Sequence, residues 1–447
     1  MKFDRSKKPQ LSAEEPFLMP SIQHFSLDNS LKVFFVEKKE LPIVRINLII
    51  RAGSIFDSTN KKGTSNLLAM CIDEGAGKYD SLELSEQFDL LGARFSLYSN
   101  SDNIHITLQS LKENYKNALN LLSLILTEPH FNENDFEREK RRVLTKIKQL
   151  SDDPDYLAST SFESLLFGKQ NPYSNPSLGT EENIMDINNE DIKSLYKKTI
   201  LPNNAFVVVV GDITRDELIS TMGKCFSGWK KSNVDLTFKN EINKDVKKIY
   251  VVNKPDSVQT EIRTGHHTSG RNSTEYFSKH LLNTILGGQF SSRINHNLRE
   301  RNGYTYGAGS TFNYYMNSAY FGISTSVGID NTVNALVEIF YELKYILKGI
   351  TEEELKFAQS SIVRKFPVNF ETYRQIASNI IGQVIYNLPE DYFDTYIENI
   401  NSVSVKAVNN AALNHIHPEI TTTVLVGDKE KLSKQLNRSE FSDVVFV

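Results

Sequence analysis

The sequence predicts an α+β fold of two homologous domains, each a mostly antiparallel sheet covered by helices. Apolar and polar residues alternate over residues 104–108 and again over 321–327, as in antiparallel strands with one buried face. A long amphipathic helix is predicted in each half, over 134–147 and 351–366. Both helices begin with acidic residues and carry basic residues later, which the helix dipole favours. The same order of elements therefore occurs twice, which indicates duplication of a whole domain rather than a short repeat.

A turn, a buried strand and a Gly-Asp exit mark the end of each predicted domain. In the first half ten residues lead from Pro202 to Asp212, and in the second half the same interval leads from Pro418 to Asp428. The residues between each pair are mostly apolar and strand-sized. The two intervals support the duplication independently of the helices.

Composition shifts set the expected domain boundaries. Residues 1–20 are proline-rich and read as an N-terminal arm, followed by a first domain over 21–231. Residues 232–247 are polar and charged, lack apolar periodicity and are predicted to be a linker. The second domain is expected over 248–447.

The overall composition excludes several classes of function. The 447 residues include 51 basic and 55 acidic side chains, and the lysines are interspersed with acids, so nucleic-acid binding is not expected. The apolar runs are far shorter than a membrane span. Two cysteines and a start without an apolar signal segment favour a reducing compartment, and we expect a cytoplasmic protein.

Residues 63–75 predict a short helix that ends at Gly75, with Thr64 or Ser65 as its cap. Positions 66, 69 and 70 are spaced i, i+3 and i+4, so they share one side of this helix and could face a cleft. They are occupied by Asn66, Ala69 and Met70. An amide, a methyl group and a thioether are poor zinc ligands, and none of them moves a proton.

Short motifs along the chain resemble the pitrilysin, insulin-degrading-enzyme and mitochondrial-processing-peptidase family of zinc endopeptidases. The resemblance runs from about residue 4 to residue 431, and it depends on the order of these motifs. They are Leu41-Pro42-Ile43-Val44, Arg51-Ala52-Gly53-Ser54, Asp152-Asp153-Pro154, Asn171-Pro172-Tyr173, Leu201-Pro202-Asn203-Asn204 and Leu298-Arg299-Glu300-x-x-Gly303-Tyr304-x-Tyr306. The resemblance implies that the two domains form half of a peptidase chamber.

In this family the helix at residues 63–75 carries His-x-x-Glu-His, in which the histidines hold zinc and the glutamate activates water. The resemblance places Asn66, Ala69 and Met70 in those three positions, and Lys146 in the position of the third zinc ligand, a glutamate on a later helix. A lysine ammonium repels a metal cation. We therefore expect no metal and no cofactor in this chain.

Several other residues have side chains that can bind a metal. Cys71 is expected to be buried packing, Asp73 and Glu74 a solvated helix end, and His105 to lie on a neighbouring strand. No two of these have a recognised zinc-ligand spacing. The pair His266-His267 is expected to be solvated, and the pair His415 and His417 lacks suitable partners for a metal.

The second half keeps a different part of the family pattern. A helix is predicted over 274–286 with Asn272 as its cap and Glu275 as the capping-box partner, then a helix over 291–300, a left-handed Gly303 and a strand over 304–312. By resemblance, Arg299 and Tyr306 bind substrate carbonyls and stabilise the tetrahedral intermediate. The alternative is a purely structural role, in which Arg299 pairs with a surface acid and Tyr306 packs in a sheet. Gly287 and Gly288 are expected to border substrate, either by letting backbones approach closely or by letting a peptide slide past.

Together these features predict the non-catalytic subunit of a heterodimeric zinc peptidase. A His-x-x-Glu-His partner would hold zinc, while Arg299 and Tyr306 would act at the partner's site on unfolded or short peptides. The main alternative is a non-enzymatic scaffold or peptide-binding homologue, and a third possibility is a self-sufficient peptidase with its own metal.

Overall fold

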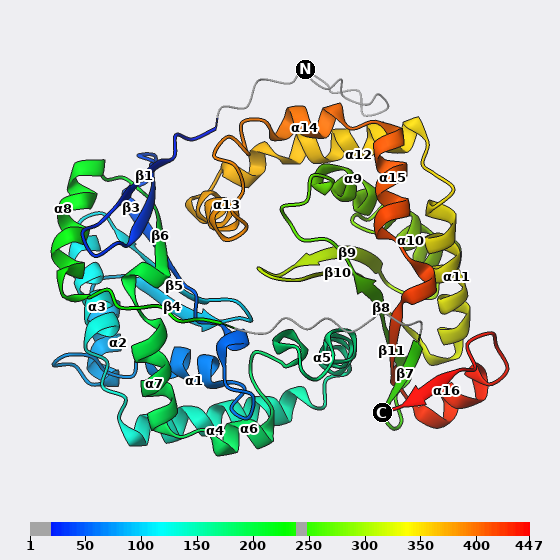
Figure 1. The fold of residues 1–447 in the computed structure, drawn as a ribbon, viewed down its shortest axis with the longest axis horizontal. Coiled ribbons are helices and arrows are strands. Elements are labelled where there is room, and N and C mark those ends of the chain that lie inside the picture. The colour runs from blue at the N-terminus through cyan, green and yellow to red at the C-terminus, as the bar shows by residue number, and fades with distance from the viewer. Residues whose placement is uncertain (1–18, 238–247) are drawn as a thin grey trace, which may run out of the picture.

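The computed structural model describes residues 19–237 and 248–447, which form two six-stranded sheets with helices around them (Figure 1). Most of the predicted arm over 1–20 and most of the predicted linker over 232–247 lie outside the described residues. The predicted α+β class is confirmed.

The two sheets repeat one topology. The first has the strand order β1 (Gln23–Ser26), β2 (Lys32–Glu37), β6 (Ala205–Gly211), β3 (Ile43–Ile50), β5 (Ile104–Leu111) and β4 (Arg94–Ser99). The second has the order β12 (Val444–Phe446), β7 (Lys248–Asn253), β11 (Thr422–Gly427), β8 (Gln259–His267), β10 (Ala319–Gly328) and β9 (Ala308–Tyr314). Apart from the first strand of each order, the two lists correspond strand for strand, including the parallel pairs β2–β6 and β7–β11.

The helices follow the same duplication. The first half contains α1 (Thr64–Cys71), α2 (Ser81–Leu90), α3 (Tyr115–Thr127), α4 (Glu133–Leu150), α5 (Pro154–Phe167), α6 (Glu181–Asp186), α7 (Asn189–Thr199) and α8 (Arg215–Cys225). The second contains α9 (Tyr276–Leu286), α10 (Arg293–Asn295), α11 (Thr332–Ile346), α12 (Glu352–Lys365), α13 (Tyr373–Ile385), α14 (Tyr396–Ser402), α15 (Val405–His415) and α16 (Lys429–Leu436). The long acidic-to-basic helices predicted from the sequence are α4 and α12, and both are confirmed.

Each half lends one helix to the other half's sheet. Helix α5 packs against β8 and β11, where Phe162 and Leu166 join Val424 in one apolar cluster. Helix α13 packs against β3 and β6 of the first sheet, and the Tyr373 hydroxyl donates to the Lys38 carbonyl at 2.9 Å. Figure 1 shows both helices near the middle of the molecule, between the two sheets. The two halves therefore share buried apolar surface.

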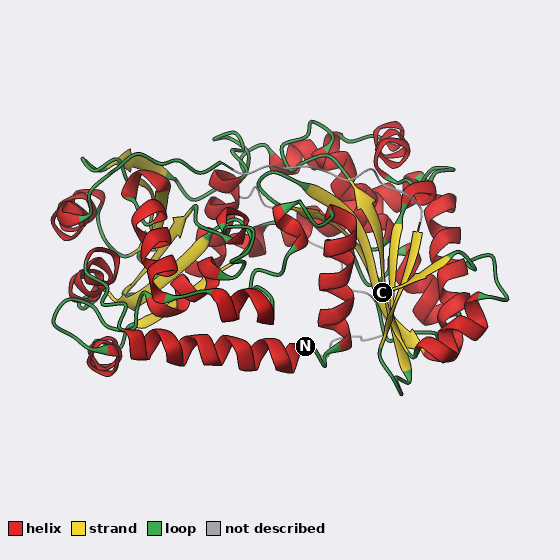
Figure 2. Cartoon of the chain, turned by 60° about the horizontal axis from the view of Figure 1, so that its bottom comes forward, coloured by secondary structure: helices red, strands yellow, loops and turns green. Residues whose placement is uncertain are grey.

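The opposite face of the first sheet carries the main core of that half. Alternate residues of β2, β3 and β5 are fully buried there under α1 and α3, including Phe35, Leu48 and Ile106. Figure 2 shows this layering of helices on the sheets. The α1 helix is thus fixed between the sheet and α4, which positions the candidate site.

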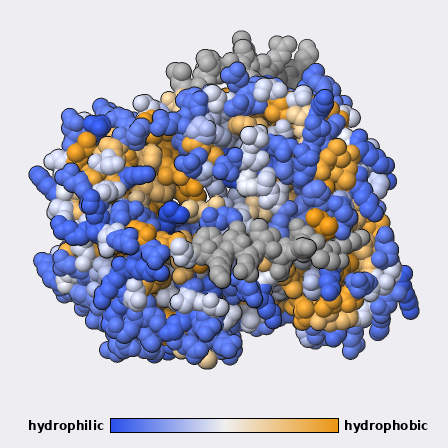
Figure 3. Space-filling view, viewed as in Figure 1, coloured by the Kyte–Doolittle hydropathy of each residue, from blue (hydrophilic) through white to orange (hydrophobic). Residues whose placement is uncertain are grey.

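No helix in the described ranges is both long enough and apolar enough to cross a bilayer. On the face seen in Figure 3, apolar residues gather in separate patches among hydrophilic ones.

Candidate functional site

Helix α1 is capped from outside its own sequence. Its N-cap is Gly63, whose φ of 99° is left-handed, and neither Thr64 nor Ser65 caps the helix, so that prediction was wrong. The Asp57 carboxylate instead accepts from the backbone N–H of Gly63 at 2.8 Å and of Ser65 at 2.9 Å. Burial raises the pKa of Asp57 to about 6, although these hydrogen bonds oppose the shift. Asp57, which lies before the helix in the sequence, thus takes the place of a capping residue.

The three motif positions contain nothing suited to metal binding or proton transfer. Asn66 and Met70 lie one turn apart, and the Asn66 Nδ2 donates to the Met70 Sδ at 3.6 Å. Ala69, which lies between these two residues in the sequence, is buried and only 1% exposed. Lys146 on α4 is exposed, and α4 packs against α1. Within the described ranges, no three His, Cys, Asp or Glu side chains form a group that could hold a metal ion.

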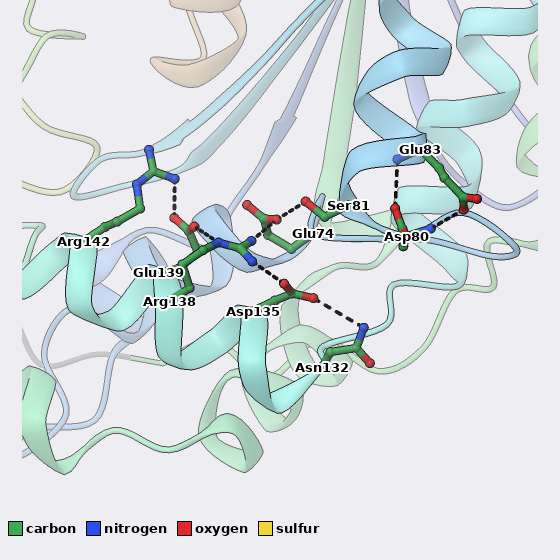
Figure 4. A network of polar contacts seen from close by, with 9 residues as sticks. All are labelled: Glu74, Asp80, Ser81, Glu83, Asn132, Asp135, Arg138, Glu139 and Arg142. Carbon is green, nitrogen blue, oxygen red and sulfur yellow. Dashed lines mark hydrogen bonds and ion pairs between the residues drawn. The ribbon is translucent and has the colours of Figure 1, made fainter.

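An ion-pair network occupies the side of α4 that faces the end of α1 (Figure 4). Glu139 is 1% exposed, and it accepts from Arg138 Nε at 3.2 Å and Arg142 Nη1 at 2.7 Å. Arg138 also pairs with Glu74, which in turn accepts from the Ser81 hydroxyl. Glu74 and Glu139 are therefore neutralised by guanidinium groups of the protein itself.

Two neighbouring groups are perturbed by this packing. Burial, together with the negative charge of Glu74, raises the pKa of Asp73 to about 7. Burial likewise raises the pKa of the Cys71 thiol. Cys71 is buried packing, as predicted, whereas the expectation that Asp73 and Glu74 form a solvated helix end was wrong.

This network was not predicted from the sequence, because its central contact is not local. The i, i+3 spacing of Glu139 and Arg142 was visible, but Glu74 and Arg138 are 64 residues apart in the sequence. Only the packing of α1 on α4 brings them together.

The Arg299–Tyr306 segment lies at the surface of the second half. Arg299 belongs to a π-helical turn, His296–Arg301, that continues α10. Its guanidinium lies 4.6 Å from the centroid of the Phe290 ring, and its Nε lies 3.3 Å from a carboxylate oxygen of Glu300. Arg299 therefore pairs with a surface acid, as the purely structural alternative predicted.

Tyr306 departs from the predicted arrangement. The strand predicted from residue 304 begins only at Ala308, so Tyr306 lies in the preceding loop rather than in the sheet. Its side chain is 92% exposed and makes no hydrogen bond to any described residue. Gly303 has the predicted left-handed φ, at 66°, and ends the π-helical turn. The purely structural alternative also predicted that Tyr306 packs in a sheet, and that prediction was wrong.

Gly287 and Gly288 link α9 to this segment. The Ser310 N–H donates to the Gly287 carbonyl at 3.1 Å, and a Cβ on Gly287 would lie 2.4 Å from that Ser310 nitrogen. A Cβ on Gly288 would lie 2.7 Å from the Asn283 amide nitrogen. Close backbone approach therefore accounts for Gly287, while a contact of either glycine with substrate stays a prediction.

Two cap and histidine expectations were wrong. Helix α9 begins after Glu275, without a cap from Asn272, and Glu275 instead pairs with His415 at 2.8 Å. His266 lies at the end of β8 and is 1% exposed rather than solvated. Its Nε2 accepts from the His417 N–H at 3.1 Å, which explains the burial. These histidines serve the packing of the second half.

Comparison with known proteins agrees with this architecture. Residues 32–180 match the family profile described as insulinase (peptidase family M16), and residues 186–362 match the profile described as the peptidase M16 inactive domain. A "non-peptidase homolog YmxG" of Helicobacter pylori is 25% identical over 404 residues, covering 89% of this chain and 92% of that protein. An "uncharacterized zinc protease" of Rickettsia felis is 27% identical over 416 residues, covering 90% of this chain and 97% of that protein.

Solved structures share the fold over nearly the whole chain. A crystal structure titled as a peptidase M16 inactive domain, from Pseudomonas fluorescens, superimposes with a TM-score of 0.85 at 25% identity, covering 91% of this chain and 98% of that one. A Helicobacter pylori structure titled as a protease also gives 0.85, at 19% identity, covering 91% of this chain and all of that one.

Proposed function

Since the chain belongs to the insulinase family, peptidase family M16, and has lost that family's zinc-binding and proton-transferring residues on α1, we propose that it is the non-catalytic subunit of a heterodimeric zinc peptidase. A homologue with an intact His-x-x-Glu-His helix would supply the zinc. This chain would supply Arg299 and Tyr306 to the partner's site, and would have no cofactor of its own.

The contrast between the two family segments carries this proposal. The residues around α1 are buried or neutralised by each other, whereas the Tyr306 phenol is 92% exposed and has no partner within the described ranges. A large aromatic side chain that does not pack against its own fold is available for a ligand or another chain. This is the behaviour expected of a residue that acts outside its own domain.

The chemistry of these two side chains suits acyl transfer. A guanidinium and a phenol are hydrogen-bond donors that can meet the negative charge developing on a carbonyl oxygen. Removal of one such donor typically slows turnover by about 10²–10³-fold. Neither side chain can activate water at neutral pH, so the hydrolytic step depends on the partner.

The proposed substrates are unfolded or short peptides. Strands β4 and β9 lie at the outer ends of their sheets, and each is paired on one side only within the described ranges. An extended peptide can add to such an edge through its backbone. We further place the protein in a reducing compartment such as the cytoplasm, because Cys71 and Cys225 are both free thiols.

Co-purification from the source cell, followed by zinc analysis and a peptide-hydrolysis assay, tests the proposal. We expect a His-x-x-Glu-His homologue to accompany the chain, zinc to follow that partner, and only the mixture to hydrolyse peptides. Hydrolysis by the isolated chain would contradict the proposal and favour a self-sufficient peptidase. A stable complex without hydrolysis would contradict it in favour of a scaffold or peptide-binding role.

A further inference from the structure

A cavity of about 1140 Å³ runs along strand β4 at the edge of the first sheet. One wall is the sheet face that looks toward the second half, and the other walls are α2 and the first turns of α13. The donated helix α13 thus closes a space that the first half would leave open. The cavity lies in the same half as the altered zinc-site helix, but its lining does not include Asn66, Ala69 or Met70.

Strand register determines the polar wall of this cavity. Arg45 of β3, Gln109 of β5 and Arg94 of β4 are direct cross-strand neighbours, so their side chains share one face of the sheet. The next row on that face contains Asn47, Thr107 and Ser96, and the row beyond it contains His105 stacked on Tyr98 at 4.7 Å. This face of the sheet is therefore mainly polar, and its charged side chains are those of Arg45 and Arg94.

The charges of these arginines are not neutralised. Arg45 Nη1 donates to the neutral amide oxygen of Gln109 at 3.0 Å, and its Nε is buried without an acceptor among the described residues. Arg374 at the start of α13 is exposed and faces the same cavity. The two arginines line the same cavity, and α13, which carries Arg374, packs against β3, which carries Arg45. Burial lowers the pKa of Arg45, and the positive charge of Arg374 also lowers it.

Within the described ranges, no carboxylate forms an ion pair with Arg45, Arg94 or Arg374. That contrasts with Arg138 and Arg142, which pair with Glu74 and Glu139. Like charges held near one another in a half-buried site are unfavourable unless an anion lies between them. A ligand carboxylate would remove this repulsion and complete the hydrogen bonding of both guanidinium groups.

The cavity also has an apolar part. Leu84, Phe88 and Phe95 contribute to its lining and offer a surface for apolar groups of a ligand. Of the acidic residues in the lining, Glu74 already pairs with Arg138 of α4. A ligand carboxylate would therefore be drawn to the guanidinium groups, while apolar side chains of the same ligand could lie on the aromatic lining.

We propose that this cavity binds a short peptide through its carboxylate, which is held between Arg45 of β3 and Arg374 of α13. The inference rests on the proposed function only in taking a peptide as the ligand. Because the two arginines come from different halves of the chain, binding depends on the exchange of α13 onto the first sheet. The carboxylate belongs either to the peptide's C-terminus or to an acidic side chain.

Fluorescence anisotropy on the isolated full chain tests this inference without a partner subunit. The probes are three short alanine–glycine peptides labelled at the N-terminus with an uncharged fluorophore: one with a free C-terminus, one amidated, and one amidated with an internal glutamate. We expect the free carboxylate peptide to bind, and amidation to weaken binding by roughly tenfold or more, since a charged hydrogen-bonded pair is lost. Binding of the glutamate peptide at the same strength would identify an acidic side chain as an equally good source.

Arg374→Gln is the main variant, because this exposed residue can be replaced without disturbing the core. It should weaken binding of the free carboxylate peptide by roughly tenfold or more, and Arg45→Gln should do the same if it folds. Arg438→Gln, an exposed arginine just beyond α16, is the matched control and should bind as the wild type does. Equal binding of the free and amidated peptides, no binding of any probe, or unchanged binding in Arg374→Gln would overturn the inference. None of these results depends on whether a zinc subunit exists, so the shared-site proposal is tested separately.

Discussion

The end of α1 in the first half and the Arg299–Tyr306 segment in the second half differ in the burial and pairing of their side chains. Beside α1, Glu139 is 1% exposed and pairs with Arg138 and Arg142, and Glu74 pairs with Arg138. In the second half, Tyr306 is 92% exposed and Arg299 lies half-exposed over Phe290. Glu139 beside α1 is part of the packing of its own half, whereas Tyr306 is open to solvent. Substitutions of the buried or paired side chains in the first region should therefore change stability, whereas substitutions of the exposed Arg299 and Tyr306 should change only function.

The largest effect on stability is expected at the base of the second region. In Gly287→Ala the new methyl group would lie 2.4 Å from the Ser310 backbone nitrogen, so α9 and β9 must move apart. We expect a loss of about 3 kcal/mol in the free energy of unfolding, measured by urea denaturation. Gly307→Ala is the control, because its methyl group meets open space and should have little effect. An unchanged unfolding midpoint in Gly287→Ala would show that the two elements are not held by this contact.

Glu139→Ala tests the network of the first region. The substitution leaves Arg138 and Arg142 without their shared carboxylate and opens a small cavity. We expect a loss of about 2 kcal/mol on denaturation, less than for a fully buried pair because both arginines reach solvent. Arg142→Ala should cost under about 1 kcal/mol, since that side chain is 66% exposed. Equal losses in the two variants would contradict the central place of Glu139.

Asp73 should make stability depend on pH in the same region. Burial raises its pKa in the folded protein to about 7, whereas the unfolded chain titrates near its ordinary value of 3.8. Well above pH 7 the folded state must hold the charge, so Asp73→Asn should be more stable than wild type. The full shift corresponds to about 4 kcal/mol, but Asp73 is only partly buried and solvent screens its charge, so we expect roughly 1–2 kcal/mol. As the pH falls through 7 the native carboxyl takes up its proton first, and the difference should shrink to nothing near pH 4. Denaturation of both proteins across this range measures the effect, and a difference that is independent of pH would contradict it.

Tyr306→Ala should have the smallest effect on stability. The side chain is 92% exposed and makes no described hydrogen bond, so the free energy of unfolding should change by under about 0.5 kcal/mol. A larger loss would mean that Tyr306 packs against its own fold, and the contrast between the two regions would disappear.

Local sequence patterns predicted the elements but not their partners. The periodicity and charge order of α4 and α12 were sufficient, and alternation identified β5 and β10. The packing of α5 on the second sheet and of α13 on the first was not predictable, because the apolar face of a helix does not specify which sheet it covers. For the same reason the cavity between β4 and α13 was not foreseen, although Arg45 and Arg374 were both visible.

The candidate site was predicted from residue identities more securely than from geometry. The loss of ligands at Asn66, Ala69 and Met70 follows from side-chain chemistry alone. The placement of Tyr306 on a strand failed because a local turn intervenes, in which the Gly307 N–H donates to the Thr305 hydroxyl at 3.1 Å. Because of that turn β9 begins only at Ala308, and the Tyr306 side chain is exposed to solvent.

The most direct test of a hydrolytic centre divided between two polypeptides is the turnover number of the purified complex carrying Arg299→Ala. Arg301→Ala, an exposed arginine on the same π-helical turn, is the matched control. With assembly and zinc content unchanged, we predict that Arg299→Ala lowers turnover by about 10²–10³-fold while Arg301→Ala leaves it near the wild-type value. Wild-type turnover from the Arg299→Ala complex would contradict the account.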